Sequence, residues 1–322
     1  MELDFKLTDK EGLDCFAGCM VSILEWKGMD CSILFRNAWE FNFAENFKQH
    51  FLKDLIREPE IIDYNILRII FGITIHYKEY VDKDNIINII KEQVEKNLPV
   101  IVIHDMYWCP WLKSFQFRHA PEHGSIVIGY DDSNFICSDY VPKCNRGVLP
   151  YEYIGKSFKG MFILKIDSNS VMKNIDFNKI MSSIIESVIF KNVFAEIRRF
   201  GNYIKNDFDP ISEFNQYGES DFGISNPVNW IIERIAYSRY YFTQALSAIN
   251  KELKTDYLPV SINKLLDAKE QWLVIRAAIM ECCISRKSSK LTHISELIIN
   301  LANFEENIFY GLQKNFNIAI DI

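Results

Sequence analysis

The chain has 322 residues, a length that fits one large domain or two domains of ordinary size. Its composition, 48% hydrophobic and 14% aromatic, is typical of a globular protein with a substantial core and excludes a disordered chain. A net charge of −7 argues against a nucleic-acid-binding protein, because such proteins need a basic surface.

No segment has the pattern of a signal peptide or of a membrane span. The start of the chain is acidic where a signal peptide is basic, and the longest apolar runs are too short to cross a bilayer. We therefore expect a cytoplasmic protein with no membrane partner. Thiols stay reduced in the cytoplasm, so the eight cysteines are interpreted as free thiols.

The first part of the chain predicts an α+β domain. Cys15–Lys27 has helical apolar spacing, with Asp14 as its N-cap and Gly28 as its C-terminal stop. Asp84–Asn97 predicts a second helix of the same kind. Apolar segments then predict four strands, which are Val100–Ile103, Ser125–Tyr130, Asn134–Asp139 and Gly160–Ile166. A helix followed by antiparallel strands is typical of the α+β class.

After residue 167 the pattern becomes mostly helical. A loop is predicted at Asp207–Pro227, between the helices Ile175–Ile204 and Trp230–Leu253, because this segment is rich in Gly, Pro, Asp, Ser and Asn. These patterns divide the chain into a domain of residues 1–167 and a helical domain of residues 168–322. The predicted helices are Ile175–Ile204, Trp230–Leu253, Ile262–Ser285 and Ile294–Gln313.

Three residues of the first domain can form a nucleophilic triad. Cys15 opens a helix, where unpaired N–H groups and the helix dipole favour a thiolate. His123 enters a strand and can act as the base, and Asp139 ends the next strand and can orient the imidazole. Cys19 lies one turn after Cys15 and is the reserve nucleophile. The alternative is that both cysteines are small core residues.

Other reactive residues carry weaker signals. His119 lies in a predicted loop four residues before His123 and is the alternative base. No metal ligand or cofactor site is expected, because the cysteine and histidine spacings of metal sites and the Gly-rich loops of nucleotide sites are absent from the sequence. The aromatic residues just before His119 are a candidate acyl pocket, although most such clusters are core: Trp108, Trp111 and Phe115.

At these positions the chain resembles the papain-like cysteine peptidases that cleave double-glycine leaders from bacteriocins. In that family an Asp-Cys pair starts the helix, a second Cys often follows four residues later, and a Gly closes it, as Cys15, Cys19 and Gly28 do here. The family's His, apolar strand and following Asp match His123–Gly129 and Asp139. The resemblance covers residues 1–167 and implies a papain-like fold, with an N-terminal helix and an antiparallel sheet.

Three features depart from the pattern of these peptidases. No Gln precedes Cys15 to serve the oxyanion hole, and Asp9 stands in its place. Tyr140 follows Asp139 where the peptidases have Pro, and the membrane spans of the exporter-linked members are missing. The helical second domain is closer to a related group, the butirosin-type acyltransferases of secondary metabolism.

The second resemblance implies an amide-forming acyltransferase of antibiotic biosynthesis. Its donor would be a thioester on an acyl or peptidyl carrier protein, its acceptor an amine, and Cys15 would carry the acyl group. The helical domain would then serve as acceptor site, lid or carrier-protein docking site. Two alternatives stay open: a peptidase or thioesterase with the same triad, and an inactive papain-like binding module.

Overall fold

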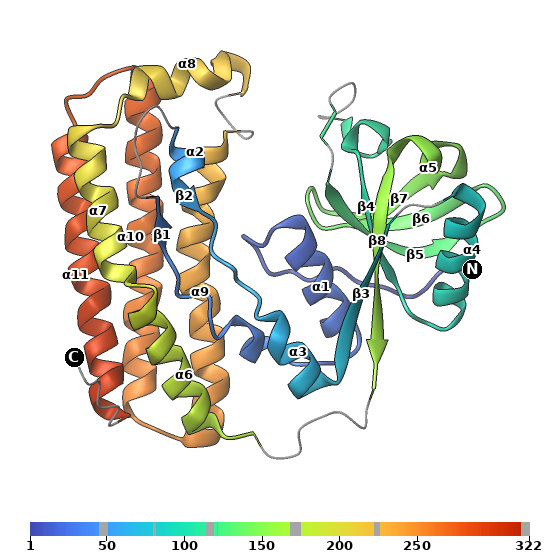
Figure 1. The fold of residues 1–322 in the computed structure, drawn as a ribbon, viewed down its shortest axis with the longest axis horizontal. Coiled ribbons are helices and arrows are strands. Elements are labelled where there is room, and N and C mark those ends of the chain that lie inside the picture. Colours follow the sequence, from blue (N-terminus) through green and yellow to red (C-terminus); the bar gives the residue numbers. More distant parts are fainter. Residues whose placement is uncertain are drawn as a thin grey trace. The chain divides into compact units, whose positions relative to one another are not determined.

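The computed structural model describes residues 1–44, 51–79, 82–113, 119–120, 122–167, 175–221 and 226–316. The chain forms two compact units (Figure 1). We call them the sheet unit, residues 1–31 and 64–173, and the helical unit, residues 32–63 and 174–322. Helices together with antiparallel sheets confirm the α+β class. No helix among the described residues is long and apolar enough to cross a membrane.

The sheet unit contains a six-stranded antiparallel sheet in the order β3-β8-β4-β5-β6-β7. Two of its strands, β3 and β7, were not predicted from the sequence. The strands are β3 (Ile73–Glu79), β4 (Val100–His104), β5 (His123–Tyr130), β6 (Asn134–Asp139), β7 (Cys144–Pro150) and β8 (Phe158–Ile166). The helices are α1 (Cys15–Trp26), α3 (Tyr64–Phe71), α4 (Lys83–Glu95) and α5 (Tyr151–Ser157), with a 3₁₀ turn, η2 (Met106–Trp108).

The helices α1 and α4 cover opposite faces of this sheet (Figure 1). The apolar stripe of α4 packs with Val100, Val102 and Val127 in one buried core. Side chains alternate along a strand, so the neighbours of these residues face α1. Because the strands are antiparallel, β5 begins and β6 ends at the same edge of the sheet. That edge therefore brings His123 and Asp139 together.

The helical unit is built from long helices and one small two-stranded sheet. The predicted helix of residues 175–204 is two helices, because Asn192 takes a left-handed backbone conformation with φ of 49°. The elements are η1 (Ser32–Phe35), β1 (Asn42–Phe43), α2 (Leu52–Leu55), β2 (Ile56–Arg57), α6 (Phe177–Phe190), α7 (Val193–Asn206), α8 (Pro210–Asp221), α9 (Pro227–Leu253), α10 (Tyr257–Ser285) and α11 (Leu291–Asn315).

Residues 32–63 belong with the helical unit, although the sequence pattern predicts them within the domain of residues 1–167. Their aromatic side chains account for the difference. Phe35 packs against Tyr241 with ring centroids 4.6 Å apart, and Phe41 stacks on Trp272 at 5.5 Å. Phe35 and Phe41 are almost completely buried, so this segment supplies core to the helices. Burying each such ring contributes about 1.5–3 kcal/mol.

The predicted loop Asp207–Pro227 is wrong over most of its length, because α8 occupies Pro210–Asp221. Pro210 fits the first helical turn, where a backbone N–H has no helical partner. The Asp209 carboxylate accepts hydrogen bonds from the Ile211 N–H at 3.0 Å and from the Ser212 hydroxyl at 2.6 Å. Residues that favour turns are here the start signal of a helix.

Candidate active site

Cys15 is the first residue of α1 and is half-buried. The Asp14 side chain caps the helix by accepting a hydrogen bond from the Ala17 N–H at 2.7 Å. At the other end Gly28 has a φ of +76°, and the Met29 N–H donates to the Leu24 carbonyl oxygen at 3.0 Å, which together form a Schellman C-cap. The predicted helix signals at Asp14 and Gly28 therefore act as expected and fix the position of the thiol.

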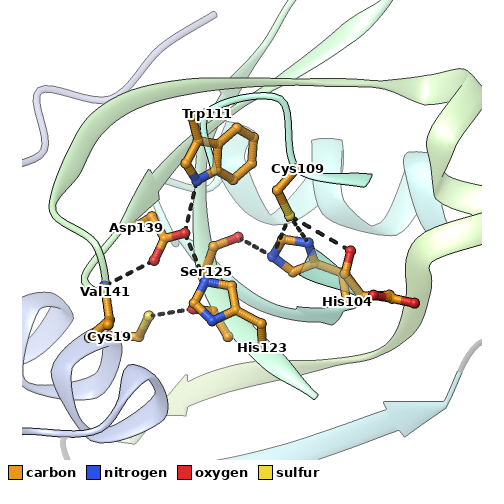
Figure 2. Close-up of polar contacts among 10 residues, drawn as sticks. Cys19, His104, Cys109, Trp111, His123, Ser125, Asp139 and Val141 are labelled. Carbon is orange, nitrogen blue, oxygen red and sulfur yellow. Dashed lines mark hydrogen bonds and ion pairs between the residues drawn. The ribbon is translucent and has the colours of Figure 1, made fainter. Parts of the chain in front are cut away.

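His123 opens β5 and its imidazole is buried, with 6% of the residue exposed. Its Nε2–H donates to Asp139 Oδ2 at 2.8 Å (Figure 2). The side chain also hydrogen-bonds to Cys15, which leaves Nδ1 as the ring nitrogen for the thiol. A Cβ placed on Gly124, the next residue, would lie 3.8 Å from Cys15 Sγ. The three residues of the predicted triad thus meet at one edge of the sheet.

The surroundings of His123 favour its protonated form. Burial alone would lower the pKa, but the hydrogen bonds to Asp139 and Cys15 outweigh it and raise the pKa to about 9. At neutral pH His123 is therefore an imidazolium beside the Cys15 thiol. A positive charge at this place stabilises a thiolate, which is the nucleophilic form of cysteine.

Residues 14–140 match the sequence model of the family described as butirosin biosynthesis protein H, N-terminal. This segment resembles the N-terminal region of that protein. It begins at the N-cap of α1 and ends one residue after Asp139, so it contains Cys15, His123 and Asp139. No curated protein matches the chain.

Within the butirosin-H-like segment, Asp139 accepts hydrogen bonds on both carboxylate oxygens. Besides His123, the Trp111 Nε1–H donates to Oδ2 at 2.8 Å, and the Val141 N–H donates to Oδ1 at 3.1 Å (Figure 2). An asparagine at position 139 would have only one acceptor oxygen. In either orientation its NH₂ group would face another donor, the Val141 N–H or the Trp111 Nε1–H. The site is therefore built for a carboxylate.

Trp111, a residue of the candidate acyl pocket, has a role that the sequence did not predict. Its indole lies against the backbone of β7, where a Cβ on Gly147 would come within 2.5 Å of the ring. That packing holds the Nε1–H toward Asp139. Of the other two residues of the candidate pocket, Trp108 lies 5.4 Å from Tyr153 between ring centroids, and Phe115 falls outside the described residues.

Cys19, the reserve nucleophile, is completely buried. Its thiol donates to the Gly124 carbonyl oxygen at 3.6 Å (Figure 2). Burial raises the pKa of Cys19 well above its usual range, and the negative charge of Asp139 raises it further. These surroundings keep Cys19 a neutral thiol, and they favour Cys15 as the nucleophile.

A second thiol–imidazole pair lies beside the first and was not recognised in the sequence. His104 Nδ1 lies 2.8 Å from Cys109 Sγ, and its Nε2 lies 2.9 Å from Ser125 Oγ. Burial lowers the pKa of His104 to about 3, and the charge of His123, 5.4 Å away between ring centroids, lowers it as well. Burial also raises the pKa of Cys109. This pair is therefore neutral and packs as core.

His119 is the alternative base. Its Nδ1 hydrogen-bonds to Asp105 Oδ2 at 2.7 Å, and its ring stacks on Tyr107 with centroids 4.4 Å apart. The side chain is 68% exposed. Nothing in these contacts brings His119 to Cys15, so the geometry favours His123 as the base.

No three His, Cys, Asp or Glu side chains gather to hold a metal ion anywhere in the described ranges. All eight cysteines are free thiols.

The raised pKa of His123 predicts a pH-dependent stability. A base whose pKa rises from 6.5 to about 9 on folding stabilises the folded state fully below pH 6.5, and this contribution disappears as the pH rises through 9. Asp139→Asn removes the main partner of the imidazolium. We expect the thermal midpoint of Asp139→Asn to lie below that of the natural protein at pH 6, by about 2–4 °C for each kcal/mol lost.

The gap between the two midpoints should narrow when both proteins are melted at pH 9.5. A gap that stays constant between pH 6 and pH 9.5 would show that His123 titrates at an ordinary pKa. Tyr130→Phe, which removes a hydrogen bond to Glu95 in the same unit, is the control for general pH effects.

Proposed function

We propose that the protein is a cysteine-dependent acyltransferase of antibiotic biosynthesis, which moves an acyl group from a carrier-protein thioester to an amine. The observation that carries the proposal is the hydrogen-bonded row of Cys15, His123 and Asp139 at a helix start. The match of residues 14–140 to butirosin biosynthesis protein H supports an acyltransfer role and a place in antibiotic biosynthesis. The amide-forming step of closthioamide assembly is one specific reaction of this kind. For the sheet unit, which contains these three residues, we propose the papain-like fold.

In the first half-reaction the Cys15 thiolate attacks the carbonyl carbon of the donor thioester. The bond to the carrier's phosphopantetheine sulfur breaks, and the His123 imidazolium gives that sulfur its proton. The product is an acyl-Cys15 thioester with a neutral His123. Because one thioester replaces another, this step is close to thermoneutral.

In the second half-reaction an amine attacks the acyl-Cys15 carbonyl. His123, now neutral, accepts the proton of the amine, and the Cys15 thiolate leaves as the amide forms. Asp139 holds Nε2–H throughout and stabilises the imidazolium that returns. An amide is more stable than a thioester, so this step makes the sequence run forward.

The oxyanion formed in each step needs hydrogen-bond donors. The start of α1 offers the Cys15 backbone N–H, supported by the positive end of the helix dipole. Asp9, which stands where related peptidases have Gln, is exposed and hydrogen-bonds to Lys6 at 3.4 Å. Asp9 therefore does not replace the glutamine donor.

A transferase differs from a hydrolase with the same triad in how it handles water at the acyl-enzyme. We propose that the helical unit provides the acceptor-binding surface and limits the access of water, and that an acyl or peptidyl carrier protein and an amine are the partners. No bound cofactor is required, since the donor brings its own phosphopantetheine arm.

The test is to mix the full-length protein with an acyl-pantetheine thioester and follow its intact mass. We expect a single acyl adduct on Cys15 that persists in water and is discharged as an amide when an amine is added. Cys144→Ala should acylate normally, because Cys144 is the other half-buried thiol and controls for unspecific reaction.

The same experiment distinguishes the alternatives. An adduct that water removes rapidly, with free acid as the only product across a broad set of amines, would indicate a peptidase or thioesterase. No adduct from either a pantetheine or a carrier-protein thioester would indicate an inactive binding module.

A further inference from the structure

We infer that Tyr140 is a positioning residue, which fixes the Cys15 end of α1 against the strands that carry His123 and Asp139. The inference rests on the proposed function, because it concerns the geometry of the same three residues. Tyr140 directly follows Asp139 and is only 5% exposed. Its side chain contacts the chain on both sides of Cys15.

The ring of Tyr140 lies on the backbone of α1 at Gly18, one turn after Cys15. A Cβ placed on Gly18 would lie 2.2 Å from Cγ and Cδ1 of the ring, far closer than real atoms approach. Only glycine at this place lets the ring rest against the helix backbone. The contact therefore sets the distance between α1 and the end of β6.

The hydroxyl of Tyr140 holds the segment that leads into Cys15. It donates to the Lys10 carbonyl oxygen at 2.6 Å and accepts from the Leu13 N–H at 3.4 Å. Leu13 precedes Asp14, the N-cap that starts α1. One side chain thus fixes both the approach to the nucleophile and the helix turn that follows it.

The backbone around Tyr140 is itself fixed to the other two residues of the site. Asp139 Oδ1 accepts from the Val141 N–H at 3.1 Å, which closes a turn around Tyr140. The Cys19 thiol hydrogen-bonds to the Tyr140 backbone and, at 3.6 Å, to the carbonyl oxygen of Gly124, which follows His123. The helix α1 is therefore tied to the chain at the residues adjoining His123 and Asp139. Figure 2 shows the hydrogen bond of the Cys19 thiol.

This arrangement has a consequence for reactivity. Misplacing a reacting group by about 1 Å can cost about 10²-fold in rate, although the groups that react are all present. Loss of the Tyr140 contacts should therefore weaken the pairing of Cys15 with His123 without removing either side chain.

The experiment measures the rate at which iodoacetamide alkylates Cys15, followed by peptide mass between pH 5.5 and pH 9. Tyr140→Phe is the main variant, since it keeps the ring and removes only the hydroxyl. We expect its alkylation rate at pH 7 to fall about tenfold, and its pH profile to move toward that of His123→Ala. Acyl-enzyme formation should show a lower kcat with little change in KM.

Tyr130→Phe is the matched control. It removes a tyrosine hydroxyl from β5 whose hydrogen bond to Glu95, at 2.6 Å, is as short as the one lost in Tyr140→Phe. We expect the natural alkylation profile from this variant. Gly18→Ala is the second test variant, since it pushes the ring off α1, and it should slow alkylation at least as much as Tyr140→Phe.

A folded Tyr140→Phe with the natural rate and pH profile, alongside a slow His123→Ala, would overturn the positioning role and leave the proposed function standing. If His123→Ala itself alkylates like the natural protein, then Cys15 and His123 do not act as a pair. That result would overturn the proposed mechanism together with the inference.

Discussion

Cys15→Ala is expected to lose acyl transfer by on the order of 10³-fold or more, while the protein stays folded. The reason is chemical: alanine has no atom that can carry the acyl group, so neither half-reaction is possible. Cys15 is only half-buried, and its removal should change the thermal midpoint by about 2 °C or less. Adduct formation by mass and the thermal midpoint together check this prediction.

Cys19→Ala is the matched control, because Cys19 is a thiol on the same helix one turn away. We expect it to keep the acyl adduct, with a reduced rate because its hydrogen bond to Gly124 is lost. His123→Ala should suppress the adduct nearly as strongly as Cys15→Ala, since residues that act as a unit are not additive. Full activity in Cys15→Ala with loss in Cys19→Ala would move the nucleophile along the helix.

Local signals made the positions of Cys15, His123 and Asp139 in the fold predictable from the sequence. Asp14 marks the start of α1 and Gly28 its end, and both act as expected in the structure. The apolar segments around residues 125 and 135 gave strands whose antiparallel pairing brings the start of one to the end of the other. Each signal lies within a few residues of the position that it fixes.

The partners of these residues were not predictable, because they depend on distant parts of the chain. Trp111 reaches Asp139 only because Gly147 on β7 leaves room for its ring. Tyr140 departs from the peptidase pattern, but its contact with Gly18 comes from the packing of α1 on the sheet. No spacing within a single segment encodes either contact.

For the segment of residues 32–63, the domain that it joins also depends on distant contacts that the segment itself does not encode. Its aromatic residues predict burial but do not say which core they enter. Phe35 and Phe41 contact Tyr241 and Trp272, about two hundred residues later in the chain. Only the folded helices show that this segment belongs to them.

A fully buried ion pair joins two helices of the helical unit. Arg239 and Glu305 are both fully buried, and the guanidinium donates from Nε and Nη2 to the two carboxylate oxygens at 2.9 and 2.8 Å. The indole N–H groups of Trp39 and Trp272 each donate to the same carboxylate at 2.8 Å. Four donors therefore satisfy Glu305, and Trp39 ties the segment of residues 32–63 to α9, α10 and α11.

Glu305→Gln is expected to lower the free energy of unfolding of the helical unit by about 3–5 kcal/mol. The reason is that Arg239 stays charged and buried without its partner, while the glutamine NH₂ group faces an N–H donor. Urea unfolding followed by tryptophan fluorescence measures the loss, since Trp39 and Trp272 contact the altered side chain.

Glu306→Gln is the matched control: it changes the next residue of α11, whose partly exposed ion pair with Arg198 contributes about 0–1 kcal/mol. Arg239→Met combined with Glu305→Leu should recover part of the stability, because both charges are then removed together. Equal losses in Glu305→Gln and Glu306→Gln would show that the buried pair contributes no more than the exposed one.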